Sequence, residues 1–166
     1  MWTCAICKTQ HTKTPLCFGA DAPWRDLVPV EEFKARVALS QDQCVVDGKH
    51  FFVRGHLELP IVDHDEEFAW SVWCSLSAES FRRMSERWED PARDGDGYFG
   101  WLCTAIPVYP NTLHLKTNVL VREVGLVPLI QIQPCDHPLF TDQQAGLSME
   151  RVHEIAHTLG CVAGDG

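Results

Sequence analysis

Hydrophobic side chains recur at every second position between residues 44 and 76, which is the spacing of β-strands with one buried face. The stretch CVVDGKHFFVRGHLEL contains Asp47-Gly48, a dipeptide typical of a two-residue hairpin turn. The stretch FAWSVWCSL follows the acidic turn DHDEE and alternates in the same way. The pattern therefore predicts a β-hairpin followed by a further strand.

Three other stretches have the 3.6-residue spacing of amphipathic helices. Phe33 and Val37 lie four residues apart after a proline, Ser77 is a typical N-cap residue, and Gly160 is a typical helix stop. We predict helices near residues 30–39, 77–88 and 148–159.

The strand pattern returns in YFGWLCTAI, TLHLKTNVLVRE and PLIQIQ, and the last of these begins at Pro128, which favours a position at a sheet edge. Strands connected mainly by hairpins, with few helices, indicate an α+β fold built on an antiparallel sheet. At 166 residues the chain is expected to form one domain, residues 1–166, and its first 20 residues form a Cys/His-bearing segment integral to it.

The charge balance excludes some partners. With 14 basic and 23 acidic residues the net charge is −9, which repels phosphate backbones and argues against nucleic acid, whereas a basic protein would be attracted. The sequence has no signal-peptide pattern and no apolar run that could cross a bilayer, so we expect a cytoplasmic protein.

The cysteines are scattered along the chain, which indicates reduced thiols rather than a disulfide framework. Cys4 and Cys7 form a C-x2-C pair, and His11 and Cys17 follow. Thiolates and imidazoles at such spacing are typical zinc ligands. The sequence predicts a structural zinc site at Cys4, Cys7, His11 and Cys17, because four protein ligands leave no open position for catalysis.

Residues 153–160 read HEIAHTLG, the pattern in which zinc peptidases bind a catalytic metal through two histidines and use the glutamate as general base, here His153, His157 and Glu154. A metallopeptidase is therefore one alternative. However, the position where such peptidases usually carry a third histidine ligand is occupied here by Ala163. In addition, His153 and His157 lie roughly 100–140° from the predicted core stripe of the helix. We expect both histidines to face solvent and to bind no metal.

One face of the predicted hairpin carries four polar side chains: His50, Arg54, His56 and Glu58. Converging polar groups on a sheet could form a site for a small molecule or for hydrolysis. The competing interpretation is a solvated sheet face.

The chain resembles a bacterial family catalogued as domain of unknown function 2199. The resemblance rests on WTCAICKTQHTKTPL, CVVDGKHFFVRGHLELPI, FAWSVWCSLS, YFGWLCTAIPVYPNTLHLKT and PCDHPLFTDQQAGLSMERVHEIA, which together cover nearly the whole chain. It implies Cys4, Cys7 and His11 as family positions. The family pattern has no counterpart of Cys17, so Cys44 is an alternative fourth ligand, and it does not include the two histidines at 153 and 157.

No complete catalytic constellation is present in the sequence. We therefore expect a non-enzymatic protein-binding module, of the kind found in immunity proteins or antitoxin-type inhibitors, with a structural zinc. The alternatives are a small-molecule-binding protein or hydrolase and the metallopeptidase.

Overall fold

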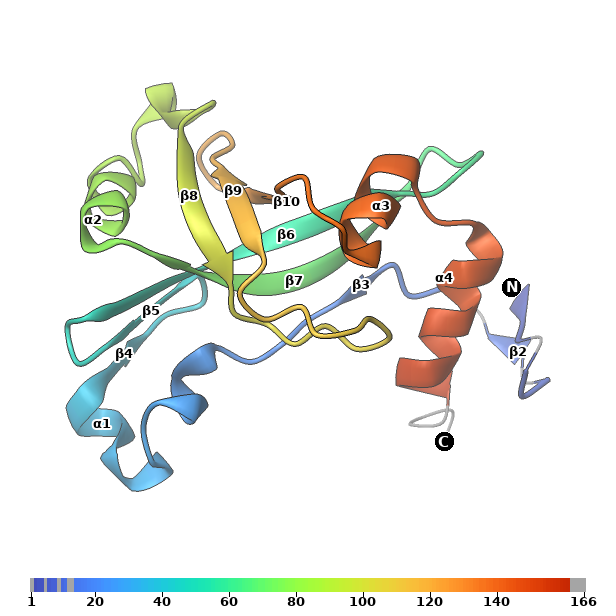
Figure 1. Cartoon of the computed structure of the whole chain (residues 1–166), viewed down its shortest axis with the longest axis horizontal. Coiled ribbons are helices and arrows are strands. Elements are labelled where there is room, and N and C mark those ends of the chain that lie inside the picture. Colours follow the sequence, from blue (N-terminus) through green and yellow to red (C-terminus); the bar gives the residue numbers. More distant parts are fainter. Residues whose placement is uncertain (1, 5, 9, 12–13, 162–166) are drawn as a thin grey trace.

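The computed structural model describes residues 2–4, 6–8, 10–11 and 14–161, with only the backbone described for residues 11, 160 and 161. Its centre is a mostly antiparallel sheet of two long strands and several shorter ones (Figure 1). The sheet strands are β3 (Cys17–Phe18), β4 (Val37–Leu39), β5 (Gln43–Val46), β6 (His50–Pro60), β7 (Glu67–Leu76), β8 (Gly97–Leu102), β9 (Lys116–Leu120) and β10 (Leu129–Ile132). The predicted α+β fold class is confirmed.

The predicted hairpin is confirmed as β5 and β6, which pair antiparallel from Gln43–Val53 to Val46–His50. Its turn residues Asp47 and Gly48 have φ of 55° and 63°, the left-handed values that a type I′ turn requires at both positions. Strand β6 then pairs along its length with β7, the third predicted strand.

The sheet closes on itself. Its order is β3-β7-β8-β9-β10-β6-β5-β4, and β6 also pairs with β7, so the strands from β6 to β10 form a closed ring. The closing pair is parallel: Leu129 lies opposite His56, and the amide of His56 donates to the carbonyl of Pro128 at 2.9 Å. The predicted edge position of this last strand is therefore wrong, because a proline that cannot donate still accepts through its carbonyl.

Glycine 55 makes this closure possible. A Cβ atom at that position would lie 2.6 Å from the Cδ1 of Ile130 and 2.8 Å from the carbonyl oxygen of Pro128. Beyond the closing pair, the outer edge of β6 is covered by the C-terminal third of the chain. The carbonyl of Glu58 accepts from the Gln143 side chain, and that of Pro60 accepts from the amide of Leu147.

Two of the predicted helices are confirmed, as α2 (Ala78–Glu86) and α4 (Met149–Ala156). Their N-caps are Ser77 and Ser148, whose hydroxyls accept from the amides of Ser80 and Arg151. Helix α4 continues as the π-helical segment η4 (His157–Cys161).

The helix predicted near residues 30–39 is largely wrong. The 3-10 turn η2 (Val30–Glu32) and one turn of helix, α1 (Phe33–Arg36), are followed by strand β4. Phe33 packs on Trp24 of the 3-10 turn η1 (Pro23–Asp26), whereas Val37 pairs with Val46 of β5. The apolar spacing in this stretch thus reflects two different contacts.

Helix α3 (Pro138–Ala145) was not predicted. It begins at a proline, and its N-cap is His137, whose Nδ1 accepts from the amide of Leu139. A further short element, the 3-10 turn η3 (Pro91–Arg93), carries the buried Arg93.

Apolar side chains form two clusters on opposite faces of the β6–β7 pair. The larger one includes Leu57, Phe68 and Ile155, and it receives the buried stripe of α4. The smaller one includes Phe52 and Trp73 and is covered by η1. None of the helices in the described ranges is long and apolar enough to cross a membrane.

The described residues up to Thr14, called the N-terminal segment below, lie beside α4, whereas β3 belongs to the sheet (Figure 1). The two short strands of this segment, β1 (Trp2–Thr3) and β2 (Gln10–His11), pair antiparallel with each other. Parts of the chain that are far apart in sequence are therefore neighbours in space.

Candidate metal centre and neighbouring sites

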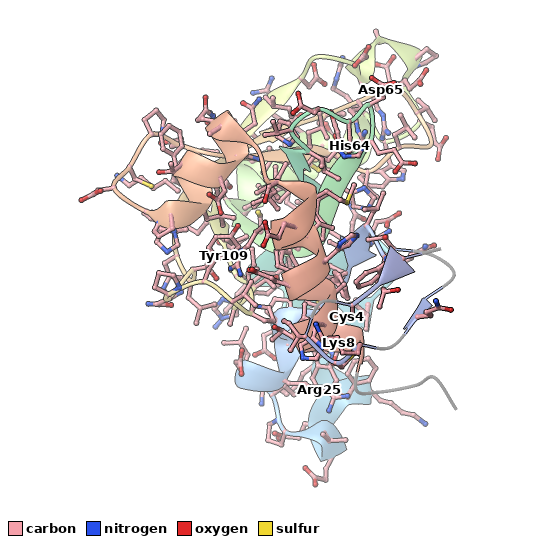
Figure 2. All side chains as sticks on the ribbon, turned by 90° about the vertical axis from the view of Figure 1, so that its right-hand side faces the viewer. Cys4, Lys8, Arg25, His64, Asp65 and Tyr109 are labelled. Carbon is pink, nitrogen blue, oxygen red and sulfur yellow. The ribbon has the colours of Figure 1, made fainter. Side chains whose placement is uncertain are left out.

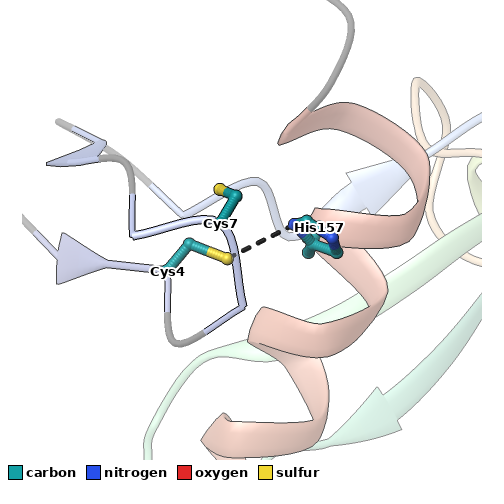
Figure 3. A group of neighbouring side chains, drawn as sticks. All are labelled: Cys4, Cys7 and His157. Atoms are coloured by element: carbon teal, nitrogen blue, oxygen red, sulfur yellow. Dashed lines mark hydrogen bonds between the residues drawn. The ribbon is translucent and has the colours of Figure 1, made fainter.

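Three potential metal ligands meet where the N-terminal segment touches the end of α4 (Figure 3). They are the thiols of Cys4 and Cys7 and the imidazole of His157, and one ligand atom from each lies within 4.8 Å of the others. A tight turn joins the two cysteines, since the amide of Lys8 donates to the carbonyl of Cys4 at 2.9 Å. Figure 2 shows Cys4 and Lys8 beside the lower part of the C-terminal helix.

The distances suit a tetrahedral metal. The Sγ of Cys4 and the Nδ1 of His157 are 3.4 Å apart. Two ligands of one zinc ion, with Zn–S near 2.3 Å and Zn–N near 2.0 Å, stand about 3.6 Å apart. Cys4 is buried, His157 is half-buried and Cys7 is exposed, so the group sits at the surface with one thiol inside. Two thiolates and an imidazole are a donor set that favours zinc over harder cations.

The four predicted ligands are distributed unevenly around this centre. Cys4 and Cys7 belong to it, whereas the side chain of His11 lies outside the described residues. Cys17 is exposed on β3, opposite Ala69 of β7, and is not in the group. Cys44, the alternative, is buried in the smaller apolar cluster, where burial raises the pKa of its thiol to about 11.

The expectation that His153 and His157 face solvent is wrong. The ring of His153 stacks on Trp2, with centroids 4.0 Å apart and planes 9° apart, and its Nε2 lies 3.4 Å from the Oγ1 of Thr14. Burial lowers the pKa of His153, which favours the neutral ring. The side of α4 that was assigned to solvent is thus covered by the N-terminal segment.

The two histidines have different neighbours. Only His157 joins the described cysteines, while His153 is engaged by an aromatic ring and a hydroxyl. A peptidase zinc would need both imidazoles as ligands and an open position for water. The arrangement therefore supports a C-x2-C site completed by the second histidine of the motif. Spacing within the helix could not reveal this, because the partners lie about 150 residues away in sequence.

The polar face of β6 is satisfied internally. Arg54 forms an ion pair with Asp42 at 2.7 Å and donates to the hydroxyl of Ser71. Glu58 lies 3.5 Å from the guanidinium of Arg122. A hydrogen bond between the carboxyl groups of Glu58 and Glu67 is the main cause that raises the pKa of Glu58 to about 7, and burial is the second.

His56 lies between these ion pairs, and burial, with the positive charges of Arg54 and Arg122, lowers its pKa. Arg54 and Glu58 on this face therefore interact with neighbouring side chains rather than line an open pocket. His50, the fourth residue of the predicted face, is separate from them and lines a groove together with Phe51 and Trp101.

This groove is a hollow of about 860 Å³ beside the hairpin turn, between η1, the ends of β7 and β8, and the loop before β9. Its walls are mostly apolar side chains, and Lys49, His50 and His114 stand among them. No sequence pattern marked it, because its residues come from five separate stretches.

Comparison with known proteins gives a family but no relative of known activity. A family model described as an uncharacterized protein conserved in bacteria matches residues 3–147. This range includes both cysteines of the metal group and ends before α4 and before His157, the first residue of η4. Neither a curated protein nor a solved structure matches the chain.

Proposed function

The chain belongs to this uncharacterized bacterial family, domain of unknown function 2199, and we propose that it is a non-enzymatic protein-binding module stabilised by one structural zinc ion. The observation that carries the proposal is the convergence of Cys4, Cys7 and His157. In this proposal the ion fastens the N-terminal segment to α4. The fourth ligand is His11, as the sequence pattern suggests, with Cys17 as the alternative.

The three ligands show what the ion would join. In the described part of the chain, strands β1 and β2 have two residues each and pair with each other. The described contacts of this segment with the C-terminal helix include the stacked rings of Trp2 and His153 and a polar contact of Thr14 with His153 at 3.4 Å. Structural zinc in small sites contributes on the order of 10 kcal/mol of apparent binding free energy, which is ample to order such a segment.

A binding role fits the remaining chemistry. On the polar face of β6, Arg54 and Glu58 are engaged in internal ion pairs, and the metal centre as proposed has no open position. The net charge of −9 suits association with a basic protein, as in an inhibitor or immunity protein. A cytoplasmic location belongs to the same proposal, because thiols remain reduced there and available to zinc.

The metal is tested by elemental analysis of untagged protein. We expect about one zinc per chain in the wild type and less than about 0.1 in Cys4→Ser and His157→Gln, since losing one ligand of a small site usually abolishes tight binding. The matched control is His64→Gln, in the acidic turn between β6 and β7 (Figure 2), which should keep its zinc. His153→Gln should keep it as well.

Each result decides between interpretations. A wild-type protein that contains no metal would overturn the proposed structural zinc site. Loss of zinc from His153→Gln, together with casein cleavage that a chelator stops, would restore the metallopeptidase. Cobalt substitution identifies the fourth ligand, because the thiolate-to-cobalt band is more intense with three thiolates than with two, and Cys17→Ser would reduce it only if Cys17 binds.

The binding role is tested with a purified partner. Affinity capture should yield a basic protein that binds the purified chain in calorimetry, with an affinity that falls as salt is added. Turnover of a small molecule by the purified chain, with no partner recovered, would overturn the binding role while leaving the zinc result intact.

A further inference from the structure

The groove beside the hairpin turn has the properties of a small-molecule site. Its volume of about 860 Å³ lies within the range of roughly 300–1,000 Å³ typical of such sites. Its walls combine side chains from η1 and the residue after it, from β6, β7 and β8, and from the loop before β9. The apolar ones include Leu27, Phe51, Leu76, Trp101 and Leu113.

These apolar walls are unusually accessible. Leu27, Trp101 and Leu113 each leave 40–41% of their surface exposed, and all three face the same hollow. The ring of Phe99, also exposed, packs edge-on against Trp101 with centroids 5.1 Å apart. Large apolar side chains that gather around one concavity favour an apolar ligand, whereas single exposed ones are ordinary.

The charged groups around the groove differ in balance from those of the whole chain. Its lining carries one carboxylate, Asp26, and one ammonium, Lys49, together with the imidazoles of His50 and His114. A second ammonium, that of Lys116, lies 5.9 Å from the centre of the Trp101 ring. Neither lysine forms an ion pair with any residue in the described part of the chain, although six of the arginines do.

We propose that this groove binds a small amphipathic carboxylate, with the hydrocarbon part against Leu27, Trp101 and Leu113 and the carboxylate at the rim beside Lys49 and His114. The charge complementarity selects this occupant. In a chain of net charge −9, two ammonium groups against one carboxylate leave a small excess of positive charge beside the groove, which disfavours a basic ligand and attracts an anionic one. Ammonium and imidazole N–H groups also donate charge-assisted hydrogen bonds to a carboxylate.

The chemistry inside the groove fits a ligand that is bound unchanged. The only thiol in the lining is that of Cys103, which donates to the carbonyl of Trp101 at 3.4 Å. Burial raises the pKa of Cys103, so this thiol is neutral at neutral pH and is no nucleophile.

The test is calorimetric titration of the full chain at pH 7.5 with three ligands of equal length: octanoate, 1-octanol and octylamine. We expect saturable 1:1 binding of octanoate, binding of octanol at least about tenfold weaker, and the weakest binding for octylamine. Trp101→Ala should weaken octanoate and octanol alike, because it removes a wall.

A second variant isolates the rim. Lys49→Gln combined with His114→Asn should weaken octanoate about tenfold and leave octanol unchanged. Asparagine is chosen at 114 because the backbone φ there is 67°, which asparagine tolerates. The matched control is Lys34→Gln, a lysine in a smaller hollow beside Trp24, which should not alter octanoate binding.

Failure to saturate with octanoate at 1 mM would overturn the proposal, as would equal affinity for the three ligands. A chain that is dimeric in light scattering and does not bind octanoate would assign the groove to a second copy and also overturn it. None of these variants touches the metal group, so zinc content is the same in all of them. The result for octanoate binding is therefore independent of the proposed structural zinc site.

Discussion

Replacing Gly55 by alanine should open the closed sheet at its tightest point. The new Cβ would stand 2.6 Å and 2.7 Å from two side-chain carbons of Ile130, and 2.8 Å from the carbonyl oxygen of Pro128. Ordinary contacts of a Cβ are about 3.4–4.0 Å, so something must move by roughly 1 Å. Ile130 is 1% exposed and packed on all sides, and the Pro128 carbonyl accepts the hydrogen bond from His56 that closes the ring.

The cost follows from these contacts. Overpacking of this kind typically destabilises a protein by about 1–3 kcal/mol, and the smaller entropy of the unfolded alanine chain offsets only about 0.4–1 kcal/mol. Because a backbone atom is among those displaced, we expect a cost at the upper end of this range, and therefore a net loss of about 2 kcal/mol in the free energy of unfolding. Urea denaturation followed by tryptophan fluorescence measures it.

The matched control is Gly19→Ala, whose Cβ would meet only the Cβ of Ser71, at an ordinary 3.9 Å. Its stability should equal or slightly exceed that of the wild type. Adding Ile130→Val to Gly55→Ala should cost less than the sum of the single changes, because the valine lacks the nearest carbon. If Gly55→Ala unfolds within 0.5 kcal/mol of the wild type, the ring does not depend on this close approach.

Two further predictions concern other groups. Glu58 binds its proton more tightly when folded, with a pKa of about 7 against 4.5, so it contributes stability below pH 4.5 that is lost as the pH rises through 7. The unfolding midpoint of the wild type should fall between pH 5 and 7.5 by more than that of Glu58→Gln, and equal falls would contradict the assignment. The guanidinium of the buried Arg93 donates to four partly buried carbonyls. Because a fully buried carbonyl left without a donor costs about 1–3 kcal/mol and these are only partly buried, Arg93→Met should lose about 2–3 kcal/mol in urea denaturation. A loss below about 1 kcal/mol would show that water replaces the guanidinium.

Local patterns predicted the parts of the fold that local contacts determine. The Asp47-Gly48 turn and the alternation in β6 and β7 identified the central hairpin and the strand beside it. The serine caps and apolar stripes identified α2 and α4. Helix α3 was not predicted because its N-cap is His137, and a histidine side chain in the N-cap role is not part of the usual pattern.

The errors arose where a distant partner decides the structure. Val37 had helical spacing from Phe33, but its pairing with β5 made it a strand residue. Pro128 suggested that β10 lies at a sheet edge. In the structure β10 pairs with β9 on one side and with β6 on the other, so it is not an edge strand. His157 was assigned to solvent because helical spacing describes only one helix. The segment that covers His157 is at the opposite end of the chain and leaves no mark on that spacing. Cys4 and Cys7 were identified by spacing alone, since the two lie in one turn.

The way β6 is covered has a consequence during synthesis. Its outer edge pairs with β10 and is then covered by Gln143 and Leu147, and all of these emerge from the ribosome long after it. Roughly 70 residues separate the two strands, so at about 5–20 residues per second the nascent chain carries an open strand edge for about 4–15 s. Unpaired edges of this kind invite pairing with other chains. In the cell, the vulnerable species is thus the unfinished polypeptide, and a trigger for aggregation or a binding site for chaperones is expected in β6 rather than in the finished surface.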